Sequence, residues 1–219
     1  MATGVITNLC MLLCAAIGSI YGGVVFLARK SPLYAKMITG AVGCLTLSKL
    51  LVAVRDMAAF ETGIFTPDTL GYVGVFLFLL CANAGLMNGL ADDGSAEFRK
   101  YRIIAFLAPL GVAGLYMFIL FSDIPTAAKV ICAVVTAVSG AASYYHFKHA
   151  IFPDVDFGVM RCVRPYNWLA LAFVFLHMGE MIASAINSEI LLIIVTVPIC
   201  IISLIILPTL RRGIEKWKT

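Results

Sequence analysis

Residues 190–210 read ILLIIVTVPICIISLIILPTL, a run that contains no charged residue. A helix that crosses about 30 Å of hydrocarbon needs about 20 mostly apolar residues, and this run has that length. Its apolar residues do not alternate with polar ones, as they do in a membrane β-strand. The segment therefore predicts a transmembrane α-helix.

Six further apolar stretches of similar length precede this segment, and short connectors separate them. They are residues 5–28, 34–54, 70–90, 103–122, 126–146 and 166–187. The chain of 219 residues is 62% hydrophobic and only 13% charged, whereas a soluble domain is about 25% charged. We therefore expect an all-α, polytopic membrane protein with seven transmembrane helices, which form a single transmembrane domain over residues 1–219.

The positive charges predict the orientation of these helices. Most of the 16 Lys and Arg fall on one side of an alternating seven-span layout, at Arg29, Lys30, Lys36, Arg99, Lys100, Arg102, Lys148, Arg161, Arg164, Arg211, Arg212, Lys216 and Lys218. The opposite loops carry Asp56, Glu61, Asp68, Asp123 and Glu189. Positive loops remain in the cytoplasm, so the N-terminus lies outside and the C-terminus inside. The compact chain and its charge bias suggest a multi-pass protein of a bacterial inner membrane.

The net charge of +4 is explained by this loop bias and by contact with anionic lipids of the bilayer. It gives no reason to expect nucleic-acid binding. The sequence also contains no glycine-rich phosphate loop and no HExxH segment. We therefore expect no cofactor, no metal site and no catalytic residues of a known motif.

An internal repeat relates the two halves of the chain. PLYAKMI at 32–38 matches PTAAKVI at 125–131, IFTPD at 64–68 resembles IFPD at 151–154, and Asn83 aligns with His177. Three helices per unit give an inverted repeat, an arrangement common in transporters. The predicted halves are residues 1–92 and 98–188, and residues 189–219 form a peripheral seventh helix with a cytoplasmic tail.

Polar residues within the spans are the candidate functional residues, because ionisable groups are costly in a membrane. At 1.5 Å per residue, Lys49 and Glu180 lie about 20 and 22 Å from the inner edge of their spans, which is the same level. His177 lies one turn from Glu180 on the same helix face. Its repeat counterpart Asn83 is expected near the middle. The predicted substrate-binding set is Lys49, Asn83, His177 and Glu180.

A structural interpretation of these residues is also open. Lys49 and Glu180 could neutralise each other and hold two helices together, while His177 hydrogen-bonds a backbone carbonyl. Gly18 and Gly22 form a GxxxG pattern that predicts close helix packing. We expect His146 and His149 to belong to an exposed aromatic belt at the inner interface. The acids at 92, 93 and 97 are expected to form a solvated loop of mixed charge.

Three functions are compatible with this sequence. We favour a small transporter or channel for a small polar or ionic solute, with its site at the midplane between the repeat halves. The alternative is a receptor-like or scaffold subunit that acts through a membrane partner, and either form could be a homo-oligomer. The third is an intramembrane enzyme in which His177 is a base that Glu180 orients.

Overall fold

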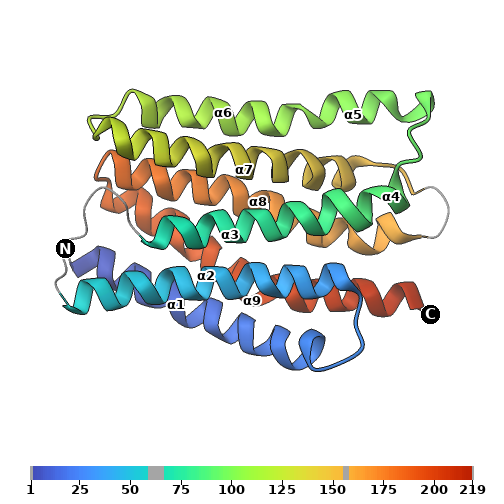
Figure 1. Cartoon of the computed structure of the whole chain (residues 1–219), viewed down its shortest axis with the longest axis horizontal. Helices are drawn as coiled ribbons and strands as arrows, with labels where there is room; N and C mark the ends of the chain where they lie inside the picture. Colours follow the sequence, from blue (N-terminus) through green and yellow to red (C-terminus); the bar gives the residue numbers. More distant parts are fainter. Residues whose placement is uncertain (1, 59–66, 155–157, 219) are drawn as a thin grey trace.

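The computed structural model describes residues 2–58, 67–154 and 158–218. Helices lie side by side and alternate in direction along the chain, with no strand in these ranges (Figure 1). The elements are α1 (Ala2–Gly22), η1 (Gly23–Leu27), α2 (Leu33–Ala58), α3 (Pro67–Cys81), η2 (Ala82–Met87), α4 (Asn88–Ala91), η3 (Ala96–Phe98), α5 (Arg99–Ala105), α6 (Leu107–Leu120), α7 (Thr126–Ile151), α8 (Val159–Ala185) and α9 (Glu189–Lys218). Elements η1 and η2 are π-helical continuations of α1 and α3.

Six of the helical stretches are long and apolar enough to cross a membrane. They are Thr3–Leu27, Leu33–Ala58, Ala96–Leu120, Thr126–Ile151, Val159–Ala185 and Glu189–Trp217, and Thr69–Gly85 is a shorter apolar helix. The prediction of an all-α multi-pass membrane protein is therefore confirmed at the level of six to seven apolar helices. The inverted repeat and the orientation stay predictions. Glu61 and residues 64–66 of the repeat lie outside the described residues.

Two helices extend beyond the bounds that the apolar pattern predicts. Helix α8 begins at Val159 and contains Pro165, although the apolar pattern placed its start at 166. Proline removes the hydrogen bond to the carbonyl four residues earlier, here that of Arg161. Arg161 is exposed at the end of the bundle, so water can satisfy this carbonyl. Helix α9 runs to Lys218, so most of the predicted tail is helical.

A proline does interrupt the fourth apolar stretch. Helix α5 ends at Ala105 and α6 begins at Leu107. The ring of Pro109 clashes with the carbonyl four residues before it, which belongs to Ala105. The break between α5 and α6 therefore lies at the residue where the ring of Pro109 disfavours a continuous helix.

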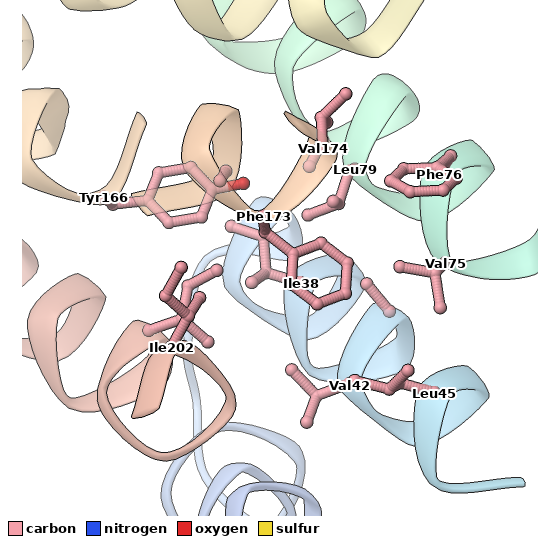
Figure 2. Close-up of a cluster of buried hydrophobic side chains, with 14 of the residues drawn as sticks. Ile38, Val42, Leu45, Val75, Phe76, Leu79, Tyr166, Phe173, Val174 and Ile202 are labelled. Atoms are coloured by element: carbon pink, nitrogen blue, oxygen red, sulfur yellow. The ribbon is translucent and has the colours of Figure 1, made fainter. Parts of the chain in front are cut away.

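The centre of the bundle is filled by large apolar side chains. Figure 2 shows them converging from α2 (Ile38, Val42, Leu45), α3 (Val75, Phe76, Leu79), α8 (Tyr166, Phe173, Val174) and α9 (Ile202). The void among these helices has a volume of only about 20 Å³. The middle of the molecule is thus closely packed, and polar side chains gather on either side of it along the helix axes.

Small residues allow the closest helix approaches. A Cβ atom on Gly18 would lie 2.4 Å from the backbone oxygen of Ser203 in α9, and one on Gly22 would lie 2.6 Å from the side chain of Thr39 in α2. The packing role predicted for this GxxxG pattern is therefore confirmed. Helix α9 packs against both α1 and α8, so it connects the two predicted halves.

The two ends of the bundle differ in charge. The C-terminus, the α1–α2 turn and the start of α8 lie at one end, and the N-terminus and the α6–α7 and α8–α9 turns lie at the other (Figure 1). The first end carries Arg29, Lys30, Arg161, Arg212 and Lys216, and we call it the basic end.

Candidate functional site

A buried ion pair joins α2 to α8. Lys49 Nζ lies 2.5 Å from Glu180 Oε1, and the two side chains are 2% and 10% exposed. Asn8 of α1 accepts a weaker hydrogen bond from the same ammonium group, at 3.4 Å. The contact shows that Lys49 and Glu180 lie at the same level of the bundle, as the distances along their helices predict.

Two aromatic side chains complete this group around Glu180. The hydroxyl of Tyr72 in α3 donates to Glu180 Oε2 at 2.9 Å, and His177 Nδ1 lies 3.3 Å from the same oxygen. The rings of Tyr72 and His177 stack with their centroids 3.8 Å apart. Lys49 Nζ lies 5.0 Å from the centroid of the Tyr72 ring. We call Lys49, Tyr72, His177 and Glu180 the Glu180 group.

A cavity of about 240 Å³ lies beside the Glu180 group, toward the N-terminal end of the bundle. Helices α3, α7 and α8 and the α6–α7 turn form its wall, through Thr69, Tyr72, Ile124, Cys132, Val135, His177, Glu180, Met181, Ser184 and Ala185. The carboxylate thus has the ion pair with Lys49 on one side and a cavity of mixed polarity on the other. Lys49 itself does not line this cavity.

The structure brings three of the four predicted site residues together and places Asn83 elsewhere. Asn83 lies in the π-helical segment η2, where its Nδ2 donates to Asn167 Oδ1 at 2.8 Å and lies 2.5 Å from His146 Nδ1. All three side chains are buried. Asn167 precedes His177 on α8 by ten residues, which corresponds to about 15 Å along the helix. We call Asn83, His146 and Asn167 the Asn83 group.

The expectation that His146 and His149 are exposed is wrong, because both side chains are completely buried. Helix α7 continues to Ile151, so both histidines lie within the last two turns of this helix. The spacing of Ser139, Ser143, His146 and His149 by three or four residues places them on one helix face. This polar stripe is the signal in the sequence that could have indicated an inward-facing side of α7.

Asp92 is also more buried than a solvated loop predicts. Arg102 donates to both of its oxygens at 2.8 Å, and Lys148 Nζ lies 2.5 Å from Oδ2. Burial by itself raises the pKa of Asp92, but hydrogen bonds from Arg102, Lys148 and the amide of Gly94 outweigh burial and hold this pKa well below its usual value. These contacts connect the loop after α4 to α5 and α7.

Sequence reasoning missed Tyr72, Cys132 and Ser184 as parts of the cavity wall. Tyrosine, cysteine and serine are ordinary constituents of apolar helices, so their types gave no reason to select them. Within the described residues, no group of three or more His, Cys, Asp or Glu side chains could hold a metal ion. The chemistry available at the cavity is therefore that of one carboxylate, an imidazole, hydroxyls and a thiol.

Comparisons with known proteins do not assign the chain to a family. No protein-family model matches the chain, and neither does any curated protein or any solved structure.

Proposed function

We propose that the protein is a small membrane transporter or channel for a small polar or ionic solute. The observation that carries this proposal is Glu180, an ionisable residue of a membrane-spanning helix that lines a cavity of about 240 Å³. Ionisable residues at such positions are typical of solute and proton pathways. A carboxylate that accepts a hydrogen bond from Tyr72 and contacts Lys49 can exchange these partners for a cation, a proton or a hydrogen-bonding solute.

The energetics of the ion pair favour this functional interpretation. A buried ion pair is commonly no more stabilising than well-packed apolar residues of similar size. Figure 2 shows that α2, α3, α8 and α9 also contact one another through a cluster of large apolar and aromatic side chains. These apolar contacts hold the helices together beside the Glu180 group, and a role in binding explains why a buried charged pair is present as well.

The two polar groups also support the inverted repeat. Asn83 aligns with His177 at a shift of 94 residues, and at the same shift Tyr72 corresponds to Tyr166. Tyr72 stacks on His177 in the Glu180 group, while Tyr166 lies with its ring centroid 5.7 Å from that of His146 in the Asn83 group. An axis that exchanged α3 with α8 would exchange Tyr72 with Tyr166 and Asn83 with His177. The solute would then meet a polar group on each side of the packed centre, as alternating access requires.

The predicted orientation places the cavity on the outer side of a bacterial inner membrane. Its wall includes the α6–α7 turn and the last turn of α8, which lie at the end opposite the basic end. In this proposal the solute reaches Glu180 from outside, and the Asn83 group lies on the cytoplasmic side.

Flux into liposomes tests the proposal. Vesicles that contain the purified protein are assayed with dyes for H⁺, Na⁺ and K⁺, and by light scattering for urea and glycerol. Glu180→Gln should reduce the flux of the transported probe at least tenfold. Glu189→Gln is the matched control, because Glu189 is an exposed acid at the same end of the bundle, and it should retain wild-type flux. Equal flux through both variants would refute the role of Glu180.

A second function receives support from the same cavity. Cys132 and Ser184 line it together with His177 and Glu180, and a thiol or hydroxyl beside a histidine is the composition of a nucleophilic site. An intramembrane enzyme that acts on a lipid is therefore the second candidate. Turnover of a lipid by the pure protein, lost in Cys132→Ala or Ser184→Ala without loss of folding, would favour it over transport.

A further inference from the structure

A cavity of about 600 Å³ at the basic end lies between α8 and α9, far from the Glu180 group. Its wall consists of Gly158, Arg161, Cys162, Pro165, Thr209, Arg212, Gly213 and Lys216. Three of these residues are cationic and none is acidic. The nearby Glu215 is paired with Arg211, at 2.6 Å, on α9. Within the described residues, the wall thus carries positive charge contributed by both helices.

The backbones of the two helices come close together at the wall of this cavity. A Cβ atom on Gly213 would lie 2.3 Å from the carbonyl oxygen of Cys162, so α8 and α9 approach each other closely there. Arg161 projects from the first turn of α8, and Arg212 and Lys216 project from the last two turns of α9. The positive end of the α8 dipole adds to the potential of the three side chains.

We propose that this cavity binds the phosphoryl group of an anionic membrane lipid. Arginine and lysine side chains that converge from two helices are the groups that bind phosphate oxygens in proteins. A basic pocket between membrane helices on the cytoplasmic side is a typical site for an acidic headgroup. Arg212 and Lys216 also complement the negative C-terminal end of α9, but this does not explain why Arg161 of α8 lines the same cavity.

The source of the phosphoryl group is a lipid because the cavity lies where the apolar surface ends. Trp217 follows Lys216 directly and is 41% exposed, and exposed tryptophan is characteristic of the membrane interface. Nearer the start of α9 the exposed side chains include the aliphatic Ile194, Val197, Ile201 and Ile205. A lipid whose headgroup occupied the cavity could place its acyl chains along this surface.

Quenching of Trp217 fluorescence by brominated lipid tests the proposal. The chain has two tryptophans, so Trp168→Phe leaves Trp217 as the reporter in full-length protein. In phosphatidylcholine vesicles, brominated phosphatidylglycerol should quench Trp217 at a lower mole fraction than brominated phosphatidylcholine does. The triple variant R161A/R212A/K216A should lower the relative affinity for phosphatidylglycerol on the order of 100-fold, since each cation contributes a few-fold to about tenfold.

A matched triple variant and a phosphate competition complete the test. R29A/K30A/R99A removes two arginines and one lysine from the same end of the bundle without touching the cavity wall, and it should retain the wild-type preference. Equal loss of preference in both triple variants would overturn the proposal, because only the total charge would then matter. Displacement of the lipid by inorganic phosphate, but not by chloride at equal ionic strength, would assign the cavity to free phosphate and overturn the lipid assignment.

Discussion

Lys49 and Glu180 depend on each other, because each would be a buried, unpaired charge without its partner. Lys49→Met leaves the Glu180 carboxylate without its cation and should lower the free energy of unfolding by about 3–5 kcal/mol. The double variant K49M/E180L replaces both charges with apolar groups and should recover most of that loss. Thermal unfolding in detergent measures the difference. A double variant that is as unstable as Lys49→Met would show that the pair itself is required for folding.

Asp92 predicts a pH dependence of stability at the basic end. Its pKa is lower in the folded protein than in the unfolded chain, so its stabilising contribution is complete above the ordinary aspartate pKa of about 3.9 and is lost as the pH falls below it. The melting temperature of the wild type should therefore fall more steeply below about pH 4 than that of Asp92→Asn. Asp123→Asn changes an exposed acid at the other end of the bundle, and its melting temperature should vary with pH as that of the wild type does. If the melting temperatures of the wild type and Asp92→Asn fell equally with pH, Asp92 would not be the source of this pH dependence.

At the scale of elements, the contact between α1 and α9 depends on Gly18. A methyl group at this position would collide with the backbone of Ser203, so Gly18→Ala should destabilise the protein by about 1–3 kcal/mol. Gly43→Ala is the control, because a Cβ atom there meets nothing within 4 Å. Chemical or thermal unfolding of both variants measures the effect. A Gly18→Ala variant as stable as Gly43→Ala would contradict the close packing of α1 on α9.

The elements were predictable to the extent that hydrophobicity alone defines them. Long apolar runs gave α1, α2, α7 and α9 because a membrane requires each span to satisfy its own backbone hydrogen bonds. The ends were less predictable, since proline does not end a helix where water or a neighbour can satisfy the freed carbonyl. Pro165 lies inside α8 for this reason, whereas Pro109 separates α5 from α6. Which face of α7 points into the bundle depends on tertiary packing, and the hydrophobicity of the sequence does not indicate it.

The residues of the candidate site were predictable only where ionisable residues lie at the same depth in different spans. Lys49, His177 and Glu180 are rare types in a membrane span, and distances along their helices placed the lysine and the glutamate at one level. The alignment of Asn83 with His177 is the only reason to predict Asn83 in the same site. In an inverted repeat, however, equivalent residues lie on opposite sides of the symmetry axis. The alignment of Asn83 with His177 would therefore predict two separate clusters of polar residues. Contacts such as that of Tyr72 with Glu180 depend on how three helices meet.

On the scale of the whole molecule, the protein is a helical bundle with a packed apolar centre, a polar group on each side of it and a basic end. This arrangement suits a pathway that opens on one side at a time, with the packed centre of Figure 2 as the barrier. A bundle that served only as a scaffold would have no need for a carboxylate at the wall of a cavity. We therefore propose that the Glu180 group carries flux and does not merely hold helices together.

Flux through the double variant K49M/E180L tests this claim most directly, because the variant keeps the helices packed while it removes both charges. It is reconstituted in liposomes beside the wild type and assayed with the same H⁺, Na⁺, K⁺, urea and glycerol probes. We predict that the double variant unfolds at a temperature close to that of the wild type and carries no more flux than protein-free vesicles. Wild-type flux through the folded double variant, or no flux of any probe through the wild type, would contradict the claim.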